Sequence, residues 1–385
     1  MRTPEEFDEI RPYDPEELPA VFEELIADPE FRAVAEQVMP GVPYEQACAL
    51  LRSCRTNLEL QQKIFHPLIT ELRNKVCDGF EFDCRDIDRT QQPYTFITNH
   101  RDIVLDSALL SISLLDSGFG NTVEIAIGDN LLIRPWIKKL VRANKSFIVQ
   151  RAVGLREMLT SSARMSRYMH YAVKVKHENI WIAQREGRAK DSDDRTQDAI
   201  LKMMAMGGEG SPVERLRQLH LVPVALSYEY DPCDYLKARE FQQKRDIEGF
   251  RKSPADDLTN MKTGIFGYKG RVCFRTAPCI DTWLDTLPAD LPKTELFTAV
   301  ARHIDREIHR SYRLYPGNYA AADLLNGTGT YAPHYTAEEK ARFEHYLKSR
   351  IELVDLPRPD TAFLRERLLT MYANPVFNHT DATDE

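Results

Sequence analysis

The sequence contains no apolar run approaching the roughly 20 residues needed to cross a membrane. Its first residues, Met1 to Glu9, are acidic and have no apolar core, so we expect no secretory signal peptide. The seven cysteines are widely spaced and form no CxxC pair, which is typical of reduced thiols in a cytosolic protein. We therefore expect a cytoplasmic protein, with any membrane contact peripheral and on the inner face.

A basic excess is also missing. The 51 lysines and arginines are outnumbered by 59 aspartates and glutamates, which gives a formal net charge of -8. Nucleic-acid-binding proteins usually carry a basic excess, so we expect no nucleic-acid partner. The chain has 385 residues, 43% of them hydrophobic, and it shows no internal repeat. That is ample for a packed core and exceeds one small domain.

Two catalytic signatures are absent from the sequence. There is no G-x-S-x-G nucleophile elbow and no HExxH zinc motif. We therefore expect no serine nucleophile of the hydrolase type. We also expect no metal or redox cofactor.

Strand-like runs of β-branched and aromatic residues alternate with helical segments in the middle of the chain. The strands are expected at residues 94–98, 123–127, 147–150, 180–183, 221–227 and 271–275. Helices are expected between them at residues 103–115, 134–143, 155–176 and 197–206. This alternation predicts an α/β fold with a mostly parallel sheet covered by helices.

The flanks of this region have helical spacing without a strand pattern. We expect a helical N-terminal region over residues 1–85, an α/β domain over 86–285 and a helical C-terminal region over 286–373. The polar residues 374–385 are expected to be a disordered tail.

Four stretches that could carry chemistry fall near the ends of the expected strands, where open α/β sheets bind their ligands. They are Asn99-His100 with Asp106, Lys145 to Arg151, Arg185-Glu186-Gly187-Arg188, and Leu221-Val222-Pro223-Val224.

In this order the four stretches resemble the glycerolipid acyltransferase superfamily, which includes the glycerol-3-phosphate and 1-acylglycerol-3-phosphate acyltransferases. That family carries a histidine and an aspartate separated by four residues, a phosphate-binding FI-x-R segment, a Glu-Gly-Thr-Arg motif and a strand with a Val-Pro pair. The resemblance covers roughly residues 90–281 and implies that family's fold for the α/β domain. The sequence departs from the pattern twice. Five residues separate His100 from Asp106, and no threonine stands between Gly187 and Arg188.

The resemblance implies transfer of a fatty acyl group from acyl-CoA or acyl carrier protein to a hydroxyl of a lysophospholipid. An imidazole with a pKa near 6.5 suits the base that this reaction needs. We therefore assign His100 as the base and Asp106 as its orienting partner, with Asp102 as the alternative carboxylate. The phosphate and substrate would be bound by a second set of residues, namely Asn99, Arg101, Lys145, Arg151, Glu186, Gly187 and Arg188.

Residues 131–145 form a basic, amphipathic stretch that includes Trp136. Such a helix either lies on an anionic membrane surface or packs its apolar face against the core. The apolar clusters at residues 109–115 and 203–206 either line an acyl-chain groove or belong to the ordinary core.

Other functions remain open at this point. The acceptor could be free glycerol 3-phosphate or an amino-acid-containing lysolipid. A metal-dependent phosphohydrolase would use His100, Asp102 and Asp106 as ligands. A non-enzymatic alternative is a membrane-surface scaffold that has lost activity, which the longer His–Asp spacing supports.

Overall fold

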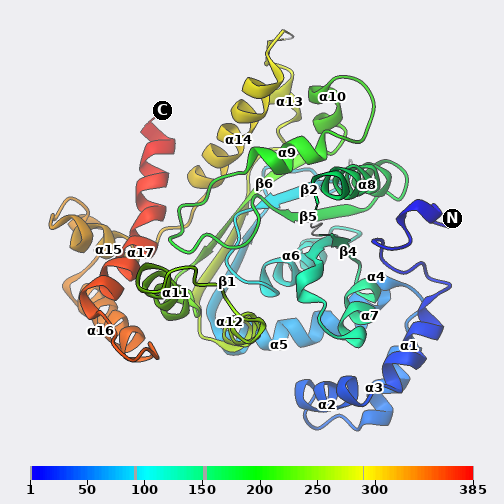
Figure 1. Cartoon of the computed structure of the whole chain (residues 1–385), viewed down its shortest axis with the longest axis horizontal. Helices are drawn as coiled ribbons and strands as arrows, with labels where there is room; N and C mark the ends of the chain where they lie inside the picture. The colour runs from blue at the N-terminus through cyan, green and yellow to red at the C-terminus, as the bar shows by residue number, and fades with distance from the viewer. Residues whose placement is uncertain (1, 91–92, 151–153, 289, 385) are drawn as a thin grey trace.

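A seven-stranded sheet occupies the middle of the computed structural model, which describes residues 2–90, 93–150, 154–288 and 290–384 (Figure 1). The strand order is β1-β7-β6-β2-β5-β3-β4. All neighbouring strands are parallel except β6 and β7, which are antiparallel. The strands are β1 (Cys77–Asp83), β2 (Thr95–Thr98), β3 (Val123–Gly128), β4 (Ser146–Val149), β5 (Asn179–Ala183), β6 (Leu221–Tyr228) and β7 (Gly270–Thr276).

Helices precede, cover and follow this sheet. The first group is α1 (Leu18–Ile26), α2 (Pro29–Val38), α3 (Tyr44–Arg52), α4 (Asn57–Leu60), the π-helical turn η2 (Gln61–Phe65) and α5 (His66–Val76). Between the strands lie η3 (Asp129–Leu131), α6 (Leu105–Asp116), α7 (Pro135–Ala143), α8 (Leu155–Lys174), α9 (Asp198–Met204), α10 (Pro212–Arg217), α11 (Asp234–Asp246) and α12 (Pro254–Phe266). After the sheet come α13 (Asp281–Leu284), α14 (Lys293–Arg310), α15 (Pro316–Asn326), α16 (Ala337–Glu352) and α17 (Thr361–Asp384). Helices α1–α3 lie at one end of the molecule and α15–α17 at the other (Figure 1).

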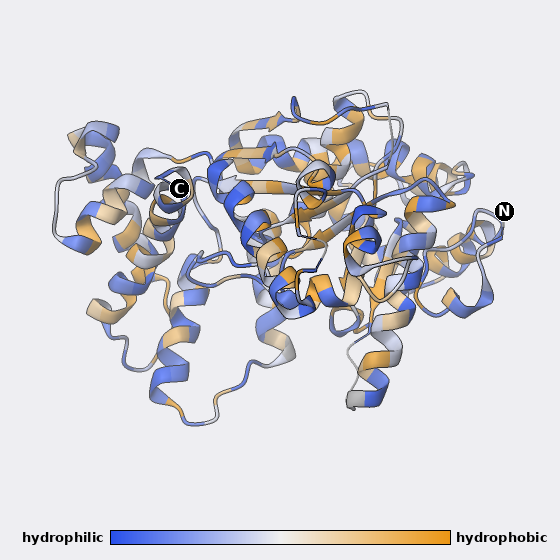
Figure 2. Cartoon of the chain, turned by 90° about the horizontal axis from the view of Figure 1, so that it is seen from above, coloured by the Kyte–Doolittle hydropathy of each residue, from blue (hydrophilic) through white to orange (hydrophobic). Residues whose placement is uncertain are grey.

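The central strands are buried on both faces, as a parallel sheet covered by helices requires. Every residue of β2 and β6 is buried. Side chains alternate along β2, so Phe96 packs in the core beneath α6 and Ile97 packs on the opposite face with residues of α8, α9 and α14. Hydrophobic residues accordingly concentrate along the strands, whereas the peripheral helices are mixed (Figure 2).

The predicted α/β fold is confirmed, and a strand lies at each of the six predicted positions. Leu109, Leu110, Leu114 and Met204 are fully buried among core residues, which favours the alternative of ordinary core for these four side chains. In the same two clusters, Leu115 lines a pocket with Phe65 and Ile69, and Met206 is exposed. The sequence analysis missed strand β1, which falls inside the region predicted to be helical. This strand is at the sheet edge and partly exposed, so its acidic residues conceal the strand pattern.

The prediction of a disordered tail over residues 374–385 is wrong for the residues that the structure describes. Helix α17 continues to Asp384, and Val376 and Asn378 are buried within it. The Asn374 amide donates to the backbone carbonyl of Asp191 at 2.8 Å. Asn374 and Asn378 therefore face another part of the chain, whereas Asp381, Thr383 and Asp384 are exposed.

The segment between β5 and α9 is held by the C-terminal helices. Asp194 lies in this segment and is fully buried. Its carboxylate pairs with Arg101 at 2.6 Å and accepts the Tyr312 hydroxyl at 2.7 Å. The carboxylate of Asp305 in α14 accepts both the N–H and the hydroxyl of Thr196, at 2.7 and 2.6 Å. The helical C-terminal region therefore braces the segment that carries Glu186, Gly187 and Arg188.

Asp305 makes the stability of this brace depend on pH. Burial raises the pKa of Asp305 to about 6, despite the hydrogen bonds from Thr196. Unfolded aspartate titrates near pH 3.9, so from about pH 4 to 6 the folded protein binds more protons than the unfolded chain. The free energy of unfolding should therefore fall as the pH rises through this window.

Asp305→Asn stays neutral and can still accept both hydrogen bonds. We expect its stability relative to the natural protein to increase by up to about 3 kcal/mol between pH 4 and pH 7.

Urea unfolding at pH 4, 5, 6 and 7 measures this difference. The exposed Asp290→Asn serves as the control and should show no such trend. A constant difference between Asp305→Asn and the natural protein at all four values would contradict the prediction.

Candidate active site

The candidate site begins where β2 ends at Thr98. The chain passes through Asn99 and His100 and enters α6 at Leu105, which puts Asp106 in the first turn of the helix. The imidazole Nδ1 of His100 lies 2.8 Å from Oδ2 of Asp106. The histidine side chain is 12% exposed, and the aspartate side chain is fully buried. The predicted pair therefore forms, with the histidine reachable from solvent.

Every other partner of Asp106 donates a hydrogen bond to it. Oδ2 accepts the backbone N–H groups of Arg101 and Asp102 at 2.7 and 3.0 Å, and Oδ1 accepts the Tyr228 hydroxyl at 3.0 Å. Burial and the nearby carboxylate raise the pKa of the Tyr228 phenol, which therefore remains a donor. A carboxylate in this role only accepts, so the ring proton of His100 sits on Nδ1. The Nε2 atom keeps its lone pair and can act as a base.

Asp102 has a different role from Asp106. Its Oδ1 accepts the N–H groups of Val104 and Leu105 at 2.9 and 2.8 Å, which caps the start of α6. Burial and the neighbouring Asp106 raise the pKa of Asp102. The structure thus places Asp106, and not Asp102, on the imidazole. The capped turn accommodates the additional residue between His100 and Asp106.

Asn99 and Trp181 fix the surroundings of His100. The buried Asn99 amide accepts the backbone N–H of Leu226 at 2.7 Å and donates to the same residue's carbonyl at 3.0 Å. The Trp181 ring in β5 packs edge-on against the imidazole, with centroids 5.7 Å apart. Asn99 thus connects the end of β2 to β6. Because its buried amide group is bonded to the backbone of Leu226, Asn99 does not fit the predicted role of a substrate ligand.

The turn that follows β5 carries the next predicted residues. Because β2 and β5 are parallel neighbours, this turn lies at the same sheet edge as His100. Gly187 is exposed with a φ of 69°, a left-handed conformation that glycine adopts without strain. Glu186 is exposed, and its backbone N–H donates to the Gln197 side chain at 2.8 Å.

Arg188 is the cation of this turn. Its Nη2 donates to Oδ1 of Asn260 at 3.2 Å, whereas its buried Nη1 has no hydrogen-bond partner among the described residues. Burial by itself would lower the pKa of Arg188, but neighbouring Cys233, Asp231 and Asp102 outweigh it and raise the pKa. Arg188 therefore stays charged and has a spare donor.

Two other predicted phosphate ligands do not fit that role. The Arg101 guanidinium is buried against Asp194, so its charge is already neutralised. Lys145 precedes β4, at the amino ends of the strands and so at the sheet edge opposite His100. There its buried ammonium contacts Glu178 at 2.5 Å and Asn121 at 2.7 Å. Both cations belong to internal ion pairs, because a buried charge must be paired.

Arg151 was also predicted to bind phosphate. It lies outside the residues that the structure describes.

The apolar face of helix α7 packs against other helices of the protein. Trp136 packs against Phe31 of α2 with ring centroids 6.1 Å apart, and Lys139 pairs with Glu24 of α1 at 2.6 Å. The buried Arg142 donates to N-terminal backbone carbonyls. This arrangement favours the packing alternative over the membrane-surface alternative for α7, which is the helical part of residues 131–145. Among the described residues, no helix combines the length and the apolar character needed to cross a bilayer.

Tyr228 is the main site residue that the sequence analysis missed. It is the last residue of an apolar strand, and only the pairing of β6 with β2 brings its hydroxyl to Asp106. An aromatic residue with a polar tip at the carboxyl end of a predicted central strand is the signal that could have indicated it.

Replacing this phenol by Phe removes one of the buried donors to Asp106. We expect Tyr228→Phe to fold and to lower the free energy of unfolding by about 1–2 kcal/mol, since a buried acceptor loses a partner. Tyr268→Phe is the matched control, because Tyr268 is half-exposed and its hydroxyl also donates to a carboxylate, that of Asp78. The control should change stability by less than about 0.5 kcal/mol. Equal effects of the two substitutions in urea unfolding would contradict the assigned role of Tyr228.

No protein-family model and no curated protein sequence matches this chain. Among solved structures, the chain is similar to the 1-acyl-sn-glycerophosphate acyltransferase PlsC from Thermotoga maritima, at 12% identity and a TM-score of 0.34. The match covers 75% of this chain and 93% of that one. The function therefore has to be argued from the site itself.

Proposed function

We propose that this protein is an acyltransferase that moves a fatty acyl group from a thioester donor, acyl-CoA or acyl carrier protein, to a hydroxyl of a lysophospholipid such as a 1-acylglycerol-3-phosphate. The observation that carries the proposal is the His100–Asp106 pair at the carboxyl edge of a parallel sheet. The sequence motifs that resemble glycerolipid acyltransferases supply the reaction class.

In the proposed reaction, the oxygen of the acceptor hydroxyl attacks the thioester carbonyl carbon. At the same time, Nε2 of His100 takes the proton of that hydroxyl. Asp106 keeps the proton on Nδ1 and stabilises the imidazolium. When the tetrahedral intermediate collapses, the carbon–sulfur bond breaks and the leaving thiolate takes the proton from Nε2. The new ester bond joins the acceptor oxygen to the acyl carbon. The acceptor itself is the nucleophile, so the protein needs none of its own.

Arg188 is the proposed ligand for the acceptor phosphate. Its guanidinium is charged, lies at the same sheet edge as His100 and has a buried donor without a partner among the described residues. A guanidinium can hold a phosphate through two parallel hydrogen bonds. Gly187 leaves room for the backbone to approach the same group.

An acyl-transfer assay on single variants tests the base. We expect His100→Ala to lose about 100-fold to 10,000-fold of the rate of transfer, because the general base is gone. Asp106→Asn should lose at least about 100-fold, because the imidazole loses its orienting carboxylate. Asp102→Asn should retain activity within about tenfold, because asparagine is also a good helix cap.

The control is His66→Ala, which removes a partly exposed histidine paired with Asp116 at 2.7 Å. Mass spectrometry of products from 1-acylglycerol-3-phosphate, glycerol 3-phosphate and an amino-acid lysolipid identifies the acceptor. Full transfer activity in His100→Ala would overturn the mechanism. Absence of transfer by the natural protein to every acceptor would favour the alternative of an inactive scaffold.

We further propose that membrane contact occurs beside the site and not through α7. Three exposed apolar side chains, Ile133, Met158 and Leu159, follow the carboxyl ends of β3 and β4. A lipid acceptor would reach His100 from this edge of the sheet. Apolar side chains that enter the headgroup region stabilise peripheral binding.

Sedimentation with vesicles of anionic phospholipid tests this contact. Replacing the three residues by Ser should weaken vesicle binding by about tenfold or more, since each substitution removes apolar area. The matched control replaces Val34, Val38 and Leu50, three exposed apolar residues of α2 and α3, by Ser. Equal binding by both triple variants would contradict the proposed contact.

A further inference from the structure

A second cluster of reactive side chains lies at the opposite edge of the sheet. His220 immediately precedes β6, and its backbone carbonyl accepts the N–H of Thr95 at the start of β2. Because β7 runs antiparallel to β6, the chain that leaves β7 returns to this amino edge. It thereby brings Cys279 and Asp281 next to His220, about 60 residues away along the chain.

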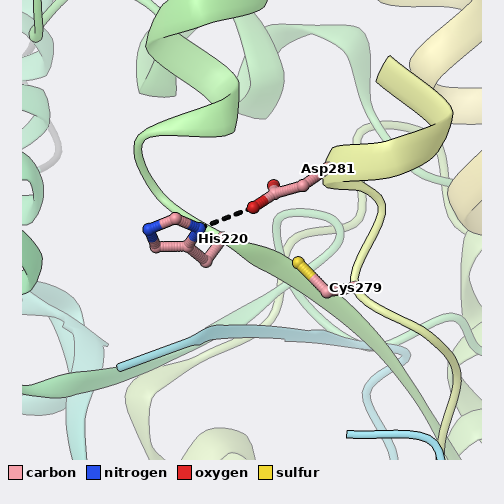
Figure 3. Close-up of side chains that lie close together, drawn as sticks. All are labelled: His220, Cys279 and Asp281. Carbon is pink, nitrogen blue, oxygen red and sulfur yellow. Dashed lines mark hydrogen bonds and ion pairs between the residues drawn. The ribbon is translucent and has the colours of Figure 1, made fainter. Parts of the chain in front are cut away.

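The three side chains converge, as Figure 3 shows. Nδ1 of His220 lies 2.6 Å from Oδ2 of Asp281, and one ligand atom from each of the three residues lies within 4.8 Å of the others. All three residues are partly buried. The second carboxylate oxygen of Asp281 is buried and has no hydrogen-bond partner among the described residues. The cluster thus contains an unsatisfied buried acceptor.

This geometry does not fit a cysteine nucleophile activated by histidine. Such a pair needs the thiol next to a ring nitrogen that can take its proton. The Nδ1 atom is already bonded to Asp281, and the other ring nitrogen lies on the side away from Cys279 (Figure 3).

The combination of ligand types instead matches a transition-metal ion. A thiolate, an imidazole and a carboxylate together are typical zinc ligands, whereas hard cations such as Mg²⁺ prefer oxygen alone. Tetrahedral Zn²⁺ places its ligand atoms roughly 3.3 to 3.8 Å apart, given bond lengths of about 2.0 to 2.3 Å. The three ligand atoms lie within 4.8 Å of one another, so the side chains must turn, and the 2.6 Å contact between His220 and Asp281 must open, to reach that arrangement.

We propose that His220, Cys279 and Asp281 bind one Zn²⁺ ion, with a water molecule as the fourth ligand. On binding, the Cys279 thiol releases its proton to solvent and its sulfur bonds to the metal. Nδ1 of His220 gives up its proton while Nε2 takes one from solvent, so that Nδ1 and a carboxylate oxygen of Asp281 bond to the ion in place of their hydrogen bond. No electron transfer is involved.

The site has a structural role and is independent of the proposed acyl transfer. His220 precedes β6 at its amino end, whereas His100 follows β2 at its carboxyl end, so the two lie at opposite ends of a pair of parallel strands. The ion would connect the start of β6 to Cys279 in the loop after β7 and to Asp281, the first residue of α13. Its binding would stabilise the folded protein by mass action.

Titration with Co²⁺ and competition with Zn²⁺ test the site on the full chain. We expect one equivalent of Co²⁺ to bind with the absorption of a tetrahedral ion and a thiolate-to-metal charge-transfer band, and Zn²⁺ to displace it. Cys279→Ser should remove the charge-transfer band. Both Cys279→Ser and His220→Asn should weaken Zn²⁺ binding by at least about 100-fold. Loss of a residue that only hydrogen-bonds to a metal ligand already lowers metal affinity by about 10-fold to 100-fold, and loss of a ligand itself should cost more.

The matched control is His66→Asn, which removes another histidine–aspartate pair that lacks a cysteine. It should leave metal binding unchanged. Zn²⁺ should also raise the melting temperature of the natural protein and of His66→Asn, but not that of Cys279→Ser. Unchanged Co²⁺ spectra in Cys279→Ser would overturn the proposal. The natural protein provides a second test in case the variants do not fold. If its Co²⁺ spectrum lacks the thiolate-to-metal band, the proposal is overturned as well.

Discussion

The candidate site depends on one buried negative charge, the carboxylate of Asp106. It lies in the first turn of α6, where free backbone N–H groups and the helix dipole favour an anion. Two backbone N–H groups of the turn before the helix, the Tyr228 hydroxyl and the His100 ring all donate to it. These donors come from the turn after β2 and from β6. One carboxylate therefore fixes the imidazole relative to the sheet.

The helical C-terminal region supports the other half of the site. It supplies Tyr312 to the buried pair of Arg101 and Asp194, and Asp305 to Thr196. The segment after β5 is thus anchored by buried charges to helices more than 100 residues later in the chain. A polar loop held in this way can present Gly187 and Arg188 in a defined position, which a freely moving surface loop could not.

The direction of the strands decides which reactive groups meet. Parallel β2 and β5 bring His100 and Arg188 to the carboxyl edge. Lys145 and His220 precede their strands and lie at the amino edge. The single antiparallel neighbour, β7, reverses the chain and adds Cys279 and Asp281 to that edge. Two chemically different clusters therefore occupy opposite ends of one sheet.

The sequence by itself determined the alternation of buried strands with helices, and it identified His100 with Asp106 as a pair. The first conclusion follows from the periodicity of apolar residues, and the second follows from the resemblance of the sequence motifs to those of the glycerolipid acyltransferases. It missed β1, where acidic residues at an exposed sheet edge conceal the strand pattern. Only the tertiary structure decided that Asp102 caps a helix, that Arg101 and Lys145 are neutralised in buried ion pairs, and that His220 meets Cys279. The partner of a buried charge depends on which distant strands lie side by side and in which direction they run, and no local pattern encodes that.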